Sequence, residues 1–429
     1  MLTPLGTLKL RWDGATGLTA ERAYWLAWSR IKDVGPVTIK RLWEHFGSLA
    51  EAWQAPAGEL LAVDGIGLLS AEKIVALRPN LNPEALLVKH EQENAAFWTP
   101  ADAGYPVLLF AINDPPPVLY YRGGLRLNER PTVLTVGMVG TRRPSAYGKR
   151  WTQRLSSALT RQGAIVISGL AAGIDTEAHT SCLNNRGLTV AVLGTGVDVV
   201  YPKHNQSLYE RIVQEGGLVV SEYPDGTGPD RAHFPQRNRI IAGLSRAILV
   251  TEAPARSGAL ITSRLANDYG REVYALPSSL DNVQGMGCLQ AIEQGAQMIL
   301  GEQLLVETLA ELPVVEVRSP HLSINSSATH SIAGVVPEPD QVASNETAAD
   351  PSATSGPSVP APSLVAQPIP ELSPVLSQVL AAVPIEPAVL DYIVPLTQVN
   401  PGEVLGALVQ LELMGLVTQL PGMHYQRAC

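Results

Sequence analysis

Short apolar runs alternate with helix-like segments between Pro131 and Gly301, and this alternation constrains the fold more than any other feature of the chain. Six runs rich in β-branched and small apolar residues are typical of strands, at 133–139, 164–167, 189–193, 218–220, 247–251 and 273–276. Helical patterns separate most of them, which favours right-handed strand–helix–strand units. A short strand before them, within 105–124, is expected to join the same sheet. We therefore predict an α/β region over 105–301, with a Rossmann-like, doubly wound, mostly parallel sheet.

The first strand of this region runs into a loop that suits phosphate. After Gly140 the chain continues as Thr-Arg-Arg-Pro-Ser, and a helix pattern begins at about Tyr147. The first amides of a helix lack internal partners, and the helix dipole places positive charge there. Arg142 and Arg143 add bidentate phosphate donors. Because neither a nucleoside-triphosphate loop nor a dinucleotide fingerprint is present, the adjacent arginines favour a polyphosphate backbone as the ligand.

Later loops are expected at the same edge of the sheet, where open parallel sheets bind ligands. Lys203 follows the Gly-Thr-Gly loop and is a candidate phosphate contact. Arg237 and Arg239 flank Asn238 at a predicted helix start, where the same anion chemistry applies. The alternative is structural, with Asn238 and one arginine as partners of Glu252. The full set predicted to bind nucleic acid is Gly140, Thr141, Arg142, Arg143, Ser145, Tyr147, Gly169, Lys203, Arg237, Asn238 and Arg239.

One predicted contact has an alternative, and one further group of residues has to be weighed as a possible catalytic or metal site. Tyr147 is either a base-stacking ring or a packing residue. Ser168, Asp175 and His179 superficially suggest a hydrolase or a metal site, but the sequence around Ser168 is not a nucleophile elbow and no third metal ligand is nearby. We interpret Asp175 as a helix cap and His179 as a packing residue. No catalytic residue, metal or cofactor is predicted.

Composition limits the class of protein. The formal net charge of −9 argues against a nonspecific polycation, so nucleic-acid binding requires a local basic patch. Three isolated cysteines, Cys182, Cys288 and Cys429, fit a reducing compartment better than a disulfide framework. The first residues lack the apolar core of a signal peptide, and no apolar run approaches the length of a membrane span. We expect a cytoplasmic protein without membrane contact.

The N-terminal part, 19–98, is predicted to be helical, resembling a SAM or helix-hairpin-helix domain. Helix patterns are interrupted at Val34-Gly35-Pro36 and at Gly65-Ile66-Gly67. Such turns can bind the DNA backbone through their amides and a following lysine, for which Lys40 and Lys73 are suitably placed. The alternative is a packing domain in which the glycines serve the turns alone. Both interpretations stay open.

The C-terminal part changes in composition twice. Residues 314–370 are rich in Pro, Ser, Ala and Thr and are predicted to be a disordered linker. Residues 371–427 give three helix patterns and a β-ribbon, the outline of a winged helix. Its candidate recognition helix carries Glu403 and Glu412 and no basic residue, so protein contact is favoured over groove binding.

Taken together, these segments resemble the DprA/Smf family of DNA-processing proteins. The resemblance is carried by 105–123, 139–148, 168–179, 201–205, 234–244 and 257–262. It implies a dimeric single-stranded-DNA-binding protein of natural transformation that protects incoming strands and helps load the RecA recombinase. It also implies a phosphate pocket at Gly140, Arg142, Ser145 and Tyr147 with a lysine from a neighbouring loop, for which Lys203 is the candidate. The chain departs from the family pattern at Pro277-Ser278-Ser279 and Met286-Gly287-Cys288, near the expected dimer surface.

Two further hypotheses follow. The helix pattern near the end of the Rossmann-like region offers Leu289, Ile292 and Met298 as an apolar dimer surface, unless these residues pack on their own sheet. The rival function is a nucleotide-cleaving enzyme on a related fold, such as a phosphoribohydrolase. Those enzymes carry a Pro-Gly-Gly-x-Gly-Thr loop followed by a glutamate, whereas here Glu252 precedes the loop and the glycine pair is missing. A purely structural adaptor would leave the arginine-bearing loops unexplained.

Overall fold

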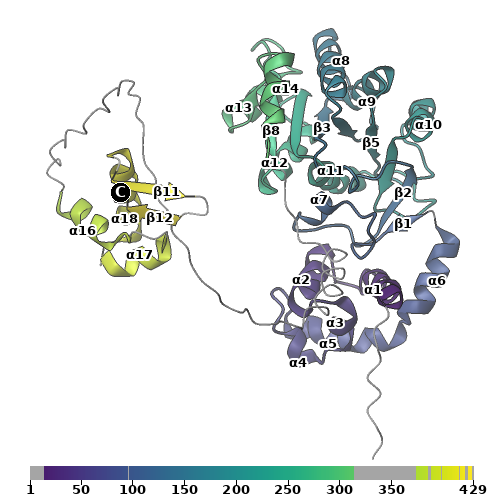
Figure 1. Ribbon diagram of the computed structural model, residues 1–429, viewed down its shortest axis with the longest axis horizontal. Coiled ribbons are helices and arrows are strands. Elements are labelled where there is room, and N and C mark those ends of the chain that lie inside the picture. The colour runs from purple at the N-terminus through teal and green to yellow at the C-terminus, as the bar shows by residue number, and fades with distance from the viewer. Residues whose placement is uncertain are drawn as a thin grey trace, which may run out of the picture. The chain divides into compact units, whose positions relative to one another are not determined.

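The computed structural model describes residues 14–94, 96–313, 373–384, 388–397, 399–414, 416–420 and 424–427. The chain divides into two compact units, Met1–Pro337 and Glu338–Cys429 (Figure 1). The predicted linker, 314–370, lies outside the described residues.

A nine-stranded sheet forms the centre of the first unit, with the order β1-β2-β6-β5-β4-β3-β7-β8-β9. The strands from β3 onward pair in parallel, while β1 and β2 are antiparallel additions at one edge. The predicted fold class is confirmed, and β3 to β8 correspond to the six predicted strands. The strands are β1 (Phe97–Trp98), β2 (Leu119–Gly123), β3 (Thr135–Gly140), β4 (Ile165–Ser168), β5 (Thr189–Val192), β6 (Leu218–Ser221), β7 (Ala247–Glu252), β8 (Glu272–Ala275) and β9 (Gln297–Met298).

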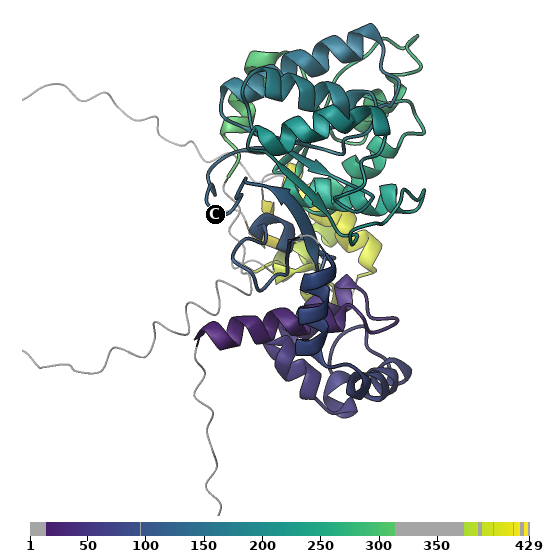
Figure 2. The same cartoon turned by 90° about the vertical axis from the view of Figure 1, so that its right-hand side faces the viewer.

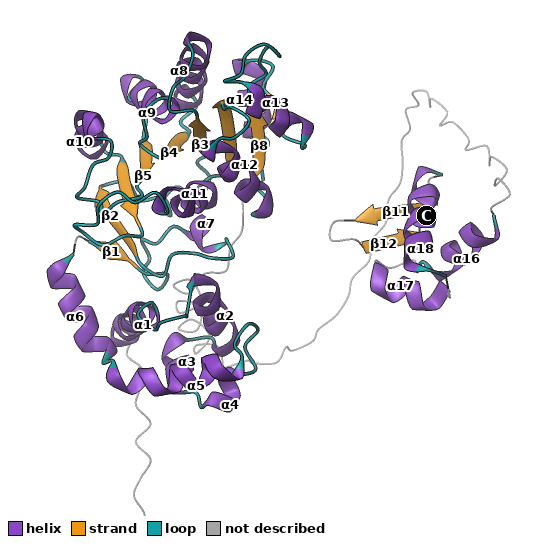
Figure 3. Ribbon diagram, turned by 180° about the vertical axis from the view of Figure 1, so that it is seen from behind, coloured by secondary structure: helices purple, strands orange, loops and turns teal. Residues whose placement is uncertain are grey.

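Helices cover both faces of this sheet (Figures 1 and 3). One layer holds α8 (Ala146–Arg161), α9 (Ile174–Asn184), α10 (Gln206–Gln214) and α14 (Glu302–Ala310), with the 3₁₀ turn η2 (Lys203–Asn205) leading into α10. The other holds α7 (Val107–Phe110), α11 (His233–Leu244), α12 (Gly258–Asp268) and α13 (Met286–Glu293). Because both faces are covered, the inner strands are buried throughout, which explains their continuous apolar runs.

The winding direction of the sheet reverses at β3. From β3 the chain builds outward through β4, β5 and β6, and then returns to place β7 on the other side of β3. The carboxyl ends of β3 and β7 are therefore adjacent but lead into helices on opposite faces. Open α/β sheets bind ligands at such a switch point.

The N-terminal helices pack beside the β1–β2 edge of the sheet (Figure 2). They are α1 (Gly14–Trp28), α2 (Pro36–Phe46), α3 (Leu49–Gln54), α4 (Ala57–Leu60), α5 (Leu68–Leu77), the 3₁₀ turn η1 (Arg78–Asn80) and α6 (Pro83–Glu93). Lys40 does not present its ammonium to the outside: Nζ donates to the Ile112 carbonyl at 2.8 Å. Lys73 pairs with Asp33 at 3.2 Å on the surface. Of the two lysines, only Lys73 lies where an outside phosphate can reach it.

The second unit is a winged helix, as predicted. It comprises α16 (Pro374–Ala382), β10 (Ala388–Val389), α17 (Leu390–Thr397), α18 (Pro401–Leu413), β11 (Val417–Leu420) and β12 (His424–Arg427), with the strand order β10-β12-β11. Leu376, Ile393, Leu408 and Tyr425 belong to its core. Across the described parts of both units, no helix combines the length and apolarity needed to cross a membrane.

Candidate nucleic-acid interface

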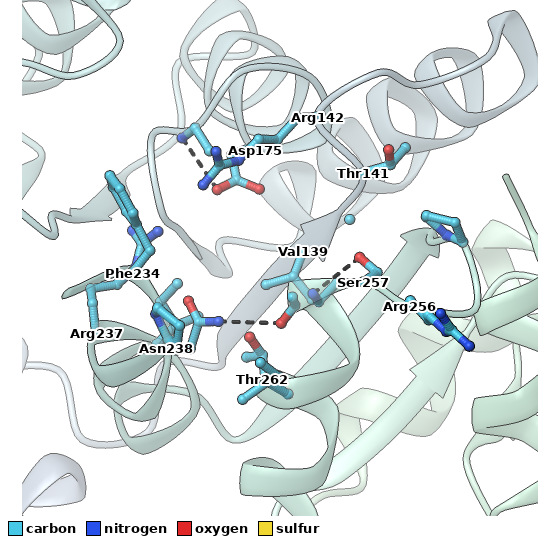
Figure 4. A pocket seen from close by; sticks show the side chains of 18 of the residues that line it. Val139, Thr141, Arg142, Asp175, Phe234, Arg237, Asn238, Arg256, Ser257 and Thr262 are labelled. Carbon is cyan, nitrogen blue, oxygen red and sulfur yellow. Dashed lines mark hydrogen bonds between the residues drawn. The ribbon is translucent and has the colours of Figure 1, made fainter. Parts of the chain in front are cut away.

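A cleft of about 650 Å³ lies at the carboxyl ends of β3 and β7 (Figure 4). The loops after β3 and β7 and the first turns of α11 and α12 supply most of its lining. The lining residues are Val139, Gly140, Thr141, Arg142, Ala171, Asp175, Tyr201, Arg231, Phe234, Pro235, Arg237, Asn238, Ile241, Pro254, Arg256, Ser257, Gly258, Ala259, Ile261 and Thr262. The cleft thus occupies the switch point of the sheet.

The loop after β3 is fixed by backbone contacts on both sides. The Thr141 amide donates to the Glu252 carbonyl at 2.7 Å, and the Ile174 amide donates to the Thr141 carbonyl at 3.2 Å. Gly173, at φ +85°, allows the β4–α9 loop to approach, since a Cβ there would lie 2.4 Å from the Thr141 carbonyl oxygen. The backbone that carries Arg142 is therefore set by its neighbours.

The cleft is cationic in an acidic chain. Its lining contains four arginines and one aspartate, a formal charge of +3 against −9 for the whole sequence. Arg142, Arg231 and Arg256 are exposed, so their guanidinium groups are accessible from outside. Guanidinium groups bind phosphate oxygens in bidentate geometry. The lining is suited to an anion with several phosphates.

Arg237 lies at the floor of the cleft rather than on its rim. Its side chain is buried, and Nη1 donates to the Gly169 carbonyl at 2.7 Å and also to the Val192 carbonyl. Gly169 leaves room for this side chain, because a Cβ there would lie 2.3 Å from Nη1 and would displace the guanidinium. Burial lowers the pKa of Arg237 to about 10, so the guanidinium stays charged at neutral pH. Arg237 and Gly169, both predicted to bind nucleic acid, build the floor of the cleft.

Asp175 holds the loop between β4 and α9 in place. Its Oδ2 accepts hydrogen bonds from the amides of Gly169 at 3.0 Å and Ala171 at 3.3 Å. Burial raises the pKa of the Asp175 carboxyl, and the neighbouring Arg237 opposes that rise. Gly173, not Asp175, is the N-cap residue of α9, so the interpretation of Asp175 as a helix cap was wrong. The carboxylate ties down the β4–α9 loop.

Two aromatic rings line the cleft, and one of them lies beside Arg142. Tyr201 and Phe234 have ring centroids 5.6 Å apart, and the Arg142 guanidinium lies 5.2 Å from the Phe234 centroid. Tyr201 is 41% exposed and Phe234 is half-buried. Exposed rings next to cations provide stacking surfaces for nucleobases close to phosphate contacts.

The N-terminus of α8 already holds an anion, the Glu252 carboxylate. Ser145 donates to it twice, from Oγ at 2.5 Å and from its amide at 2.7 Å, and Asn282 Nδ2 approaches at 3.4 Å. Ser145 also caps the helix by accepting from the Gly148 amide at 3.1 Å. The side chain of Glu252 is 1% exposed. The anion that binds at this helix N-terminus is therefore a carboxylate of the protein itself. Ser145, which holds that carboxylate, does not line the cleft.

Several other predicted residues lie away from the cleft. The Tyr147 hydroxyl donates to the Pro277 carbonyl at 3.0 Å, and its ring packs beside Trp151, which supports the packing alternative. Arg239 is buried and pairs with Glu222 at 2.6 Å and Asp114 at 3.1 Å. Its expected place at an anion-binding helix start is wrong, because α11 begins at His233 and carries Arg239 into the core.

The remaining predictions divide by position. Lys203 and Arg143 are exposed but do not line the cleft. Asn238 lines it, and its Nδ2 donates to the Gly258 carbonyl at 3.2 Å, which links α11 to α12. The hydrogen-bond partners of the Glu252 side chain are Ser145 and Asn282, so the suggested pairing with Asn238 or an arginine is wrong. Gly140 and Thr141 lie at the cleft as predicted.

Among the arginine and aromatic residues of the lining, four were absent from the predicted set: Tyr201, Arg231, Phe234 and Arg256. Two signals were present. Arg256 lies in the loop after β7, the strand beside β3, and Phe234 begins the apolar-basic stretch at the start of α11. Arg231 precedes α11 by two residues, and no motif marks it in the sequence.

The suspected hydrolase residues do not form a catalytic group. His179 is buried, and its Nδ1 lies 2.7 Å from Thr189 Oγ1. Burial lowers the pKa of His179 to about 3, so the ring is neutral at pH 7. Ser168 Oγ donates to the Met138 carbonyl at 2.6 Å. Among the residues with described positions, no cluster of three His, Cys, Asp or Glu side chains is arranged to hold a metal.

Comparison with known proteins gives consistent matches. The DNA recombination-mediator protein A family matches residues 96–310, and the DprA winged helix domain matches residues 361–423. Protein Smf of Synechocystis sp. is 47% identical over 411 residues, covering 95% of this chain and 99% of that protein. DNA processing protein DprA of Streptococcus pneumoniae is 42% identical over 225 residues, covering 52% and 78%. The X-ray structure of DNA processing protein A from the same species aligns with a TM-score of 0.57 at 34% identity, covering 68% of this chain and 98% of that one.

Proposed function

The chain belongs to the DNA recombination-mediator protein A family of DNA-processing proteins, and on that premise we propose that the cleft at the switch point binds single-stranded DNA. The bound strand is incoming DNA in the cytoplasm during natural transformation. The protein protects it and helps load the RecA recombinase. The loading and protection roles rest on the family resemblance, whereas the geometry of the cleft bears on DNA binding alone.

The observation that carries the proposal is the grouping of three exposed arginines and two aromatic rings in one cleft. Arg142, Arg231 and Arg256 supply phosphate contacts independent of base sequence. Tyr201 and Phe234 offer ring faces that stack on bases. Bases are free to stack on a protein ring only when they are unpaired. The combination therefore favours a single strand over a duplex.

A salt-titrated binding experiment tests this proposal. Fluorescence anisotropy of the full chain is measured with labelled single-stranded and duplex oligonucleotides of equal length at several salt concentrations. We expect tighter single-strand binding, with an affinity that falls with salt by roughly 0.7 in log–log slope per phosphate contact. Equal affinity for duplex, or an affinity independent of salt, would contradict the proposal.

The proposed function contains no hydrolytic step. The buried His179 has no access to a substrate, and Asp175 is held by two backbone amides. Incubating the same preparation with nucleotides and with DNA should leave both intact. Turnover that is lost in Asp175→Asn would instead favour the phosphoribohydrolase-like alternative.

The proposal includes a homodimer. Met298 is 47% exposed on the edge strand β9, and Leu300 and Leu304 beside it are 72% and 51% exposed. Leu289 and Ile292 are half-buried, with Ile292 packed on the core of its own unit, so they contribute less surface than expected. Light scattering of the full chain should give twice the monomer mass. A strict monomer across micromolar concentrations would reject the dimer.

A further inference from the structure

Helix α8 is strongly basic in an acidic chain. Its sixteen residues include Lys149, Arg150, Arg154 and Arg161 and no aspartate or glutamate. A formal net charge of −9 makes such a concentration of one sign unusual for this protein. None of these four cations lines the cleft.

Three of these cations lie along one outer face. At 100° per residue, Arg150, Arg154 and Arg161 fall within a sector of about 40° of the helix. All three are exposed, while Thr152, Leu155 and Leu159 on the other side are buried. The helix lies between α9 and α14 and is about 24 Å long at 1.5 Å per residue (Figure 1). The three arginines therefore form a row along one outer face of the helix.

Two members of the row are free to bind an anion. Within the described part of the chain, no ion pair involves Arg150 or Arg161. Arg154 pairs with Glu302 and stands 4.5 Å from the Trp151 ring centroid. An exposed pair of this kind is weak, so an arriving phosphate can compete with the carboxylate. Lys149 faces Glu177 at 3.9 Å and lies to the side of the row.

The row continues from the proposed DNA site. Arg142 lines the cleft, and the adjacent Arg143 is exposed outside the lining, three residues before α8 begins. From Arg142 to Arg161 the sequence contains no acidic residue, and the Glu252 carboxylate at the start of α8 is buried beneath Ser145. Arg143, which does not line the cleft, thus lies between the cleft residue Arg142 and the arginines of α8 in the sequence.

We propose that the outer face of α8 is a second contact surface for the same single strand, whose phosphates leave the cleft past Arg143 and lie along Arg150, Arg154 and Arg161. The inference rests on the proposed function, because the strand must first occupy the cleft. The surface holds the sugar–phosphate backbone and carries no base preference. It makes the affinity depend on strand length.

The test compares the double variant Arg150→Gln/Arg161→Gln with the wild type on two lengths of deoxythymidine oligonucleotide. One is about 4 nucleotides long and the other about 16, the limits of common single-strand site sizes. A matched control is Lys89→Gln/Arg130→Gln, which removes two exposed cations that lie neither on α8 nor in the cleft lining. Affinity and its salt dependence are measured by anisotropy.

For the long oligonucleotide we expect the variant to bind several-fold more weakly, with a salt slope reduced by about 1.4, which corresponds to two phosphate contacts. For the short one, both variants should match the wild type. An unchanged slope on the long strand, or an equal loss on both lengths, would overturn the inference while leaving the cleft proposal intact. Failure of the wild type to bind either strand would overturn both.

Discussion

The switch-point cleft and the winged helix use their cations in opposite ways. In the cleft, Arg142, Arg231 and Arg256 are exposed and free to meet a ligand. Within the described part of the second unit, Arg427 is the one arginine or lysine. Its guanidinium donates to the carbonyls of Leu380, Ala381 and Val383 at 3.0 to 3.1 Å. It caps the end of α16. A winged helix is a common DNA-binding fold, yet here the arginine forms hydrogen bonds within its own unit.

The same comparison applies to the acidic side chains. Glu403 and Glu412 are exposed on α18, the position of a recognition helix. In the cleft, the single lining carboxylate, Asp175, is buried and held by backbone amides. Acidic groups that face outward repel phosphate, while those held inside shape the site. This contrast leads us to place DNA on the first unit and protein contact on the second.

The largest expected effect comes from removing the cleft cations together, as Arg142→Ala/Arg231→Ala/Arg256→Ala. At about 1 kcal/mol per contact after allowing for solvent screening, single-strand affinity should fall on the order of 100-fold. The salt slope should fall by about 2. A control with Lys89→Ala/Arg130→Ala/Arg211→Ala removes the same charge elsewhere. Equal losses in both variants would show that net charge, and not the position of these arginines in the cleft, sets the affinity.

An intermediate effect is expected for Glu252→Gln, which tests whether the site must be held in shape. Losing hydrogen bonds to a buried charged group should lower the free energy of unfolding by about 1–3 kcal/mol. Single-strand affinity should fall on the order of tenfold, with an unchanged salt slope because no phosphate contact is removed. Glu272→Gln on the exposed start of β8 is the control. Tighter DNA binding would mean that the charge of Glu252 repels DNA more than its hydrogen bonds position the loop.

The smallest effect is expected for deletion of everything after Pro313. Because Arg427 is engaged and Glu403 and Glu412 face outward, the second unit should add little to DNA affinity. The truncated protein should bind the single strand within a few-fold of the full chain, on the scale of ~1 kcal/mol. Anisotropy of both proteins under identical salt conditions decides this. A hundredfold loss would make the winged helix part of the DNA site.

The sheet was predictable because its signal is local. The runs that became β3 to β8 are buried on both faces, and burial on both faces demands continuous apolar residues. The two-residue strands β1 and β9 have no such pattern, since sheet pairing alone defines them. The winged helix was predictable for a related reason: its helices each carry an apolar face for a small core.

The site was predictable in part, because the direction of a side chain depends on tertiary packing. Arg142 and Arg143 are neighbours in sequence, yet only Arg142 lines the cleft. Arg237 and Arg239 belong to one helix, but one forms the floor of the cleft and the other is buried against Glu222 and Asp114. The basic motif was visible in the sequence. The division between binding and structural arginines became visible only with the fold.

The internal carboxylate at the start of α8 bears on the speed of DNA capture. Since Glu252 already balances the charge of that helix end and ties Ser145 in place, the loop from Gly140 to Ser145 needs no ligand to adopt its shape. At the proposed site a strand would therefore meet a loop that already has its shape, and we expect no loop-ordering step in association. Encounter is then governed by the long-range attraction between the arginines and the phosphates. We expect the association rate to fall as the salt concentration rises, because salt screens this attraction.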